Sequence, residues 1–134
     1  MSDLVRFGVS IERNLLEEFD TFLEEKSYSN RSEAIRDLIR RNIAVRQWEE
    51  GGDAAGGIVL VYDHEKRELS ETLVDIQHHC LDIVVSNLHV HLSEHHCLEV
   101  IVVKGGVEKI EKLANELQSQ KGVYHCAVAR VATG

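Results

Sequence analysis

Three side chains that can bind a transition metal lie within one short stretch of the chain: His89, His91 and Cys97. His89 and His91 belong to a segment, Ile83 to Leu92, that alternates as a β-strand does. Their imidazoles should therefore leave the same face, roughly 6.5 Å apart. Residues 93–96 (Ser-Glu-His-His) are typical of a turn, and antiparallel pairing would return the Cys97 sulfur toward both rings. The pattern predicts a metal site on one β-hairpin.

A fourth ligand is expected from the end of the preceding helix, residues 77–80 (Gln-His-His-Cys), in the same chain or a neighbour. Imidazole and thiolate favour Ni, Cu, Zn or Co over Mg or Ca. A planar site would select Ni(II) or Cu(II), and a tetrahedral one Zn(II). Glu99 shares the strand face of Cys97 and is expected to accept the second ring N–H of a ligand histidine. Four protein ligands leave no open position for a substrate, so we do not expect an enzyme.

The apolar pattern that surrounds these ligands predicts a ferredoxin-like (ACT-like) domain. Helical spacing alternates with β-rich runs in the order βαββαβ. Such an order fits a split βαβ sheet with both helices on one face. The expected elements are residues 58–62, 69–76, 83–92, 98–104, 110–117 and 123–131.

The start of the chain predicts a strand followed by two helices. Residues 4–11 alternate, residues 15–26 repeat at helical spacing, and a second helix follows residue 30. A lone strand leaves backbone groups unpaired on both edges, and pairing with the same strand of a second copy would satisfy them. The sequence therefore predicts a dimer with a ribbon-helix-helix (βαα) fold, and an α+β protein as a whole.

This dimer could bind double-stranded DNA. A two-stranded ribbon fits the major groove, and Arg6, Gly8 and Ser10 share the strand face that would meet the bases. Asn30, Arg31 and Ser32 begin the second helix, whose N–H groups suit phosphate. Asn30 or Ser32 could also serve as the cap of that helix.

Composition and the glycine-rich stretch define the expected organisation. Four glycines in residues 48–57 indicate a flexible linker between a domain at 1–47 and one at 58–134. Domains this small bury too little surface alone, so an oligomer is expected. The net charge of −8 argues against nucleic-acid binding as an average, although local basic sites remain. No apolar run or signal peptide indicates a membrane or export, so we expect a cytoplasmic protein with reduced cysteines.

Taken together, these motifs resemble the NikR family of nickel-responsive ribbon-helix-helix repressors. Residues 30–37 (NRSEAIRD) look like its second-helix signature, and residues 63–67 (DHEKR) resemble a loop after its first sheet strand. Residues 88–91 (LHVH) with 97–99 (CLE) resemble its metal-binding strand pair. The resemblance extends over nearly the whole chain.

The resemblance implies a homotetramer, a dimer of dimers, with one Ni(II) per subunit at subunit interfaces. It implies that His78 from a neighbour joins His89, His91 and Cys97 in a planar site, with Glu99 beside it. It also implies DNA contacts from Lys66 and Arg67, and a second cation such as potassium held by Glu33 and Asp37. The expected output is repression of nickel-uptake genes. The sequence departs at Gly8, where members often carry threonine or another polar residue.

Three alternative functions follow from the same residues. A regulator of this fold could respond to another metal or to a small molecule such as an amino acid, and ligand binding would then survive Cys97→Ser. A metal-buffering protein would not need the strand-helix-helix start. A metalloenzyme would need an open coordination position.

Overall fold

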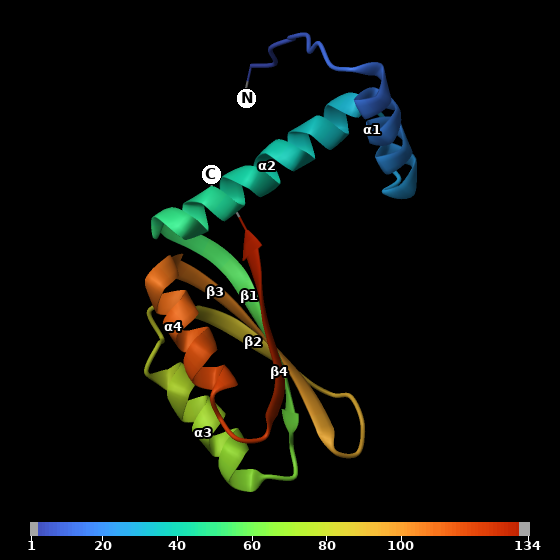
Figure 1. Ribbon diagram of the computed structural model, residues 1–134. Helices are drawn as coiled ribbons and strands as arrows, with labels where there is room; N and C mark the ends of the chain where they lie inside the picture. Colours follow the sequence, from blue (N-terminus) through green and yellow to red (C-terminus); the bar gives the residue numbers. More distant parts are fainter. Residues whose placement is uncertain (1–2, 132–134) are drawn as a thin grey trace. The chain divides into compact units, whose positions relative to one another are not determined.

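A computed structural model describes residues 3–131 of the chain. The outer ends of the two expected domains, residues 1–2 and 132–134, lie outside the described residues. The chain divides into two compact units, one up to Ile39 and the other from Arg40. The helix labelled α2 in Figure 1 runs through this division.

The first unit contains the helix α1 (Arg13–Glu25) and the first part of α2 (Arg31–Glu50). Aromatic rings of α1 and of the turn after it pack together: the Phe22 ring lies 6.3 Å from that of Phe19 and 5.9 Å from that of Tyr28. The turn before α2 is held by a bidentate ion pair, in which Arg31 donates two 2.9 Å bonds to Asp20. The two predicted helices are therefore present.

The predicted strand at residues 4–11 does not form in the single chain. These residues have no regular secondary structure, and their apolar side chains are exposed, from 42% for Ile11 to 89% for Leu4. The physical reason is the one that predicts a dimer: a strand needs a pairing partner, and none of the described segments pairs with this one. The strand was predicted to pair with a second copy, which a single chain does not contain, so the ribbon stays a prediction.

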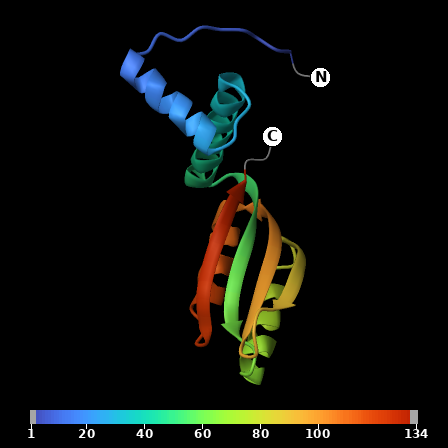
Figure 2. The same cartoon turned by 90° about the vertical axis from the view of Figure 1, so that its right-hand side faces the viewer.

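The second unit has the element order predicted from the sequence, βαββαβ. It consists of β1 (Asp53–Asp63), α3 (Arg67–His78), β2 (Val84–His91), β3 (His96–Gly106), α4 (Val107–Gln118) and β4 (Val123–Val131). The four strands form one antiparallel sheet in the order β2-β3-β1-β4. Figures 1 and 2 show α3 and α4 on one face of this sheet. The fold is α+β.

The core lies between the sheet and these two helices. Alternate residues of β1 and β3 are fully buried against α4, as the period of two requires. The largest of these strand side chains are Ile58, Leu60, Tyr62, Ile101 and Val103, and Ile110 and Leu113 of α4 belong to the same core. The opposite face of the sheet carries exposed apolar residues, including Leu88, Val90 and Val102. An uncovered apolar face of this kind is typical of a subunit interface.

The segment predicted as a flexible linker, residues 48–57, is ordered. It contains the last residues of α2, a two-residue turn, and the first half of β1. Gly51 has a φ of 75°, which is the left-handed conformation that ends many helices. A Cβ on Gly56 would lie 2.5 Å from the Ala129 carbonyl oxygen, so the glycine permits close strand pairing. These glycines serve a turn and a sheet, which composition does not distinguish from a linker.

Within the second unit, Trp48 fixes the end of α2 against β4. Its side chain is 5% exposed, its indole N–H donates to the Val131 carbonyl at 3.4 Å, and the Arg130 guanidinium lies 5.4 Å from the ring centre. We expect Trp48→Ala to lower the free energy of unfolding by about 3–5 kcal/mol, as for other buried aromatic residues. Urea unfolding measures this. Arg46→Ala, at an exposed position of the same helix, should change the free energy of unfolding by less than about 0.5 kcal/mol. Equal effects of the two substitutions would contradict this role of Trp48.

Among the described residues, no helix combines the length and the apolar character that crossing a membrane requires.

Candidate metal centre

The hairpin of β2 and β3 brings the predicted ligands onto one face. In the antiparallel register His91 lies opposite Cys97, and His89 lies opposite Glu99. Side chains that face each other across two strands point to the same side of a sheet. The Cys97 sulfur lies 3.9 Å from His91 Nδ1, and the rings of His89 and His91 are 6.4 Å apart. His91 and Cys97 therefore lie close together on the face that His89 shares, and metal binding by the three residues stays a prediction.

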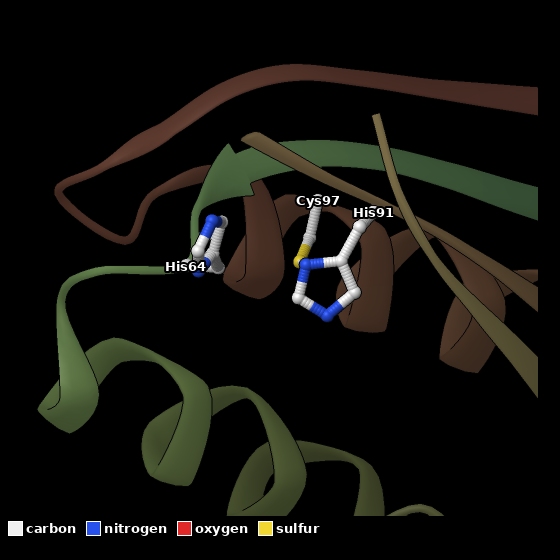
Figure 3. Close-up of side chains that lie close together, drawn as sticks. All are labelled: His64, His91 and Cys97. Atoms are coloured by element: carbon white, nitrogen blue, oxygen red, sulfur yellow. The ribbon is translucent and has the colours of Figure 1, made fainter. Parts of the chain in front are cut away.

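His64 joins this group, which the sequence analysis did not predict. Ligand atoms of His64, His91 and Cys97 all lie within 4.8 Å of one another, and the rings of His64 and His91 are 5.0 Å apart (Figure 3). His64 follows β1, whose pairing with β3 places Asp63 opposite His96. The only sequence signal was the 63–67 motif, which does not reveal that this loop lies beside the hairpin.

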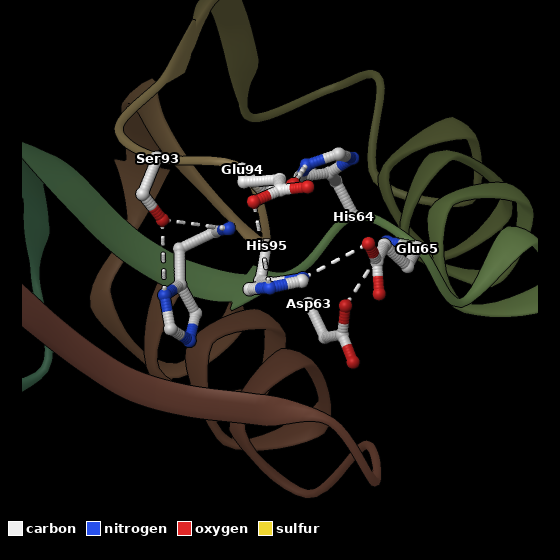
Figure 4. A network of polar contacts seen from close by, with 7 residues as sticks. Asp63, His64, Glu65, Ser93, Glu94 and His95 are labelled. Atoms are coloured by element: carbon white, nitrogen blue, oxygen red, sulfur yellow. Dashed lines mark hydrogen bonds and ion pairs between the residues drawn. The ribbon is translucent and has the colours of Figure 1, made fainter.

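A polar network holds the His64 loop against the hairpin turn. His95 Nδ1 lies 2.9 Å from a carboxylate oxygen of Glu65, and the Glu65 backbone N–H donates to Asp63 at 3.0 Å. A His64 ring nitrogen contacts the Glu94 carbonyl, and the His64 backbone N–H donates to that of His95 at 3.1 Å (Figure 4). His95, in the hairpin turn, therefore helps to position His64.

The environment of Cys97 favours a bound metal ion. The side chain is 1% exposed, and burial, followed by the nearby Glu99 charge, raises the pKa of its thiol. Glu99 itself is 4% exposed, and its carboxylate accepts hydrogen bonds from two neutral amides, Gln77 and Asn87. A buried carboxylate is costly unless a positive charge lies nearby. A divalent cation bound to Cys97 would lower the cost of ionising the thiol and the cost of burying the Glu99 carboxylate. The donor set therefore fits a transition metal.

The second contact of His89 differs from the expectation. Its Nε2 forms a 2.6 Å hydrogen bond with the Tyr62 hydroxyl, and the described contacts of Glu99 do not include a histidine. Burial raises the pKa of the Tyr62 hydroxyl, with further increases from the charges of Glu99 and Cys97. Tyr62 therefore stays neutral and fixes the His89 ring. Its role could not be read from the sequence, because it depends on β1 lying beside β3.

His78 is placed apart from this group in its own chain. It is the last residue of α3 and is exposed, and it is absent from the cluster of close ligand atoms. Its neighbour His79 contacts the Asp75 carbonyl at 2.7 Å. Cys80, the last residue of the predicted ligand segment, is a half-buried thiol whose pKa is raised mainly by burial.

The predicted DNA-contacting residues lie at several places. Arg6, Gly8 and Ser10 are exposed in the irregular N-terminal segment. Asn30 is the cap of α2, since its side-chain oxygen accepts the Glu33 backbone N–H at 2.9 Å. Arg31 is held by Asp20, and Ser32 is exposed.

The two acidic residues proposed for a second cation lie on α2. Glu33 is exposed, whereas Asp37 is half-buried and forms a hydrogen bond with the Tyr28 hydroxyl. Neither residue belongs to a group of three close ligand atoms among the described residues.

Lys66 and Arg67 line a cavity of about 440 Å³ at the start of α3, together with Gln120 and Lys121. Three cations against the one carboxylate of Glu68, together with the N-terminus of a helix, give this cavity a net positive charge, which suits contact with an anion such as a phosphate.

Comparisons with known proteins define the class. The family model described as the NikR C-terminal nickel-binding domain matches residues 55–131. The second unit is thus a nickel-binding regulatory domain. One similar solved structure, an uncharacterized protein from Thermotoga maritima, has a TM-score of 0.53, is 13% identical, and aligns over 58% of this chain and 96% of its own. That likeness shows the fold alone.

Curated relatives extend the match to the whole chain. Proteins named nickel-responsive regulator are 48% identical in Chlorobium limicola, with 100% of both chains covered, and 54% identical in Dictyoglomus turgidum, with 96% of both covered. A third, from Pyrococcus abyssi, is 52% identical over 98% of this chain and 96% of its own. The chain belongs to the NikR family of nickel-responsive regulators.

Proposed function

We propose that this protein is a transcriptional repressor that binds operator DNA when Ni(II) is bound, and that it represses nickel uptake. The observation that carries the proposal is the convergence of His91 and Cys97, with His89 beside them, on one hairpin of a nickel-binding domain. Nickel binds imidazole and thiolate together. The named relatives, which are nickel-responsive regulators, support the response to nickel.

The proposed nickel site uses His89, His91 and Cys97 of one chain and His78 of a neighbouring copy, one ion per subunit. The exposure of His78 at the end of α3 supports donation to another chain. The exposed apolar face of the sheet supports assembly into a tetramer. An ion shared by two chains would favour one arrangement of the assembly, and nickel and DNA would then strengthen each other's binding reciprocally.

The proposed DNA-binding domain comprises residues 1–47. Five apolar residues of its N-terminal segment are exposed in the single chain: Leu4, Val5, Phe7, Val9 and Ile11. Their exposure supports pairing of this segment with a second copy, which would cover apolar side chains. Arg6, Gly8 and Ser10 would face the bases, while residues 30–32, Lys66 and Arg67 would contact the backbone. Glu33 and Asp37 would hold a cation such as potassium. A protein with these partners would act in the cytoplasm.

The proposal is tested by comparing operator affinity with and without nickel. The operator is first selected from random DNA by the nickel-loaded protein. Nickel should then raise the affinity of the wild-type chain at least tenfold, and His89→Ala should remove this increase, because one ligand of the ion is lost. His125→Ala, at a histidine on β4, is the matched control. Equal affinities with and without nickel would contradict the proposed function.

Nickel affinity should depend on pH through Cys97. Burial raises the pKa of this thiol, so it carries a proton near neutral pH that a bound ion must displace. The apparent nickel affinity should therefore rise about tenfold for each pH unit between roughly pH 7 and 8. Competition with a chelator of known protonation behaviour measures the slope. A flat profile over this range would contradict thiolate binding.

A further inference from the structure

A closed triangle of hydrogen bonds lies behind the metal ligands. The Glu99 carboxylate, on β3, accepts one bond from the Gln77 amide at 2.9 Å and another from the Asn87 amide at 3.1 Å. The Asn87 amide also donates to the Gln77 carbonyl oxygen at 3.1 Å. The three side chains come from α3, β2 and β3, so the triangle connects three separate elements.

Each corner of the triangle lies next to a proposed metal ligand. Gln77 immediately precedes His78. Asn87 precedes His89 by two residues on β2, so the two share a strand face. Glu99 follows Cys97 by two residues on β3 and shares a face with it in the same way.

The triangle is chemically expensive for a purely structural contact. Gln77 and Glu99 are each 4% exposed, and a buried carboxylate bonded to neutral amides costs more than apolar side chains of the same volume. A buried polar network is favourable only when each member is satisfied, and this condition ties each member to one geometry. The described buried side chains leave no polar atom unsatisfied. The network is therefore suited to holding elements in register.

We propose that Gln77 and Asn87 are positioning residues, which act through Glu99 to hold the end of α3 against the β2–β3 hairpin. The inference rests on the proposed function, in which the hairpin of one chain binds one ion and His78 of the same chain serves another. The triangle then joins two nickel sites through a single chain. An ion that orders the hairpin also positions His78 for the next site, and this makes nickel binding cooperative.

The metal-free protein provides the first test. Asn87→Ala removes both bonds that Asn87 donates, at an exposed position of an edge strand where the fold tolerates the change. Amide hydrogen exchange at residues 77–79 should become about tenfold faster, because hydrogen bonds to charged groups stabilise this end of the helix. Asn115→Ala, at an exposed position of α4, should leave it unchanged. Unchanged exchange in Asn87→Ala would overturn the proposal.

Nickel titrations provide the second test. Gln77→Glu has the same shape but sets a second carboxylate against Glu99, so nickel affinity should fall about 10- to 100-fold and cooperativity should be lost. The exchange of both residues, Gln77→Glu with Glu99→Gln, restores a donor facing an acceptor, and affinity should return to within about threefold of the wild type. Gln118→Glu, the same chemical change at an exposed position of α4, should have no effect.

The results separate this inference from the proposed function. A single variant as tight and cooperative as the wild type, or a double variant as weak as the single one, would overturn the positioning role. A wild-type chain that fails to bind nickel would instead contradict the proposed function, while the exchange rates of the metal-free variants would still report whether the triangle holds α3.

Discussion

Replacing Cys97 with serine is expected to lower nickel affinity about 100- to 1,000-fold and to remove the thiolate absorption of the nickel-loaded protein. If nickel compares with structural zinc, four ligands together contribute about 10–16 kcal/mol, and one contributes roughly 3–4 kcal/mol. Each 1.4 kcal/mol corresponds to about a factor of ten. Serine keeps nearly the same shape but offers a poorly ionised hydroxyl, so the loss reports on the sulfur itself.

Cys126→Ser is the matched control for this prediction. Cys126 is a half-buried thiol on the same sheet, but it lies on β4 and contacts the Ala114 carbonyl at 3.7 Å. Nickel affinity and absorption should be those of the wild type. Nickel binding by Cys97→Ser with unchanged affinity and spectrum would remove the thiolate from the site. It would also favour a regulator whose ligand does not use Cys97.

Replacing Phe7 with alanine is expected to abolish DNA binding, because the proposed ribbon would lose a buried aromatic ring from each of two strands. The ring is 70% exposed in the single chain. If the dimer buries it, each truncation costs about 3–5 kcal/mol, which exceeds what a small strand pair can lose. Hydrogen exchange of residues 4–11 measures the pairing, because amides in a paired strand are protected and those in an irregular segment are not.

The adjacent residue Arg6 provides the control, since neighbouring residues of a strand point to opposite faces. Arg6→Ala should leave the protection of residues 4–11 intact while lowering operator affinity by about 1–3 kcal/mol, the usual contribution of an arginine paired with a base. The two variants thus separate pairing from recognition. Rapid exchange of residues 4–11 in the wild-type protein bound to DNA would show that no ribbon forms.

Most of the second unit could be predicted because its signals are local. Alternation in residues 83–92 and helical spacing near Leu113 report on one element at a time, and the resulting order βαββαβ is confirmed. The ordered structure of residues 48–57 could not be predicted from composition, since glycine occurs both in flexible segments and in tight packing. Trp48 is the residue that decides between them here, because its burial requires the chain around it to be ordered.

The sequence by itself determined that His89, His91 and Cys97 share one hairpin face, because strand geometry and a four-residue turn leave little choice. Only the tertiary structure decided what surrounds them. His64, Tyr62 and Gln77 reach the site from other elements, through strand pairing and helix packing between distant residues. Such contacts depend on which strands become neighbours, and the period of a single segment carries no information about its neighbours.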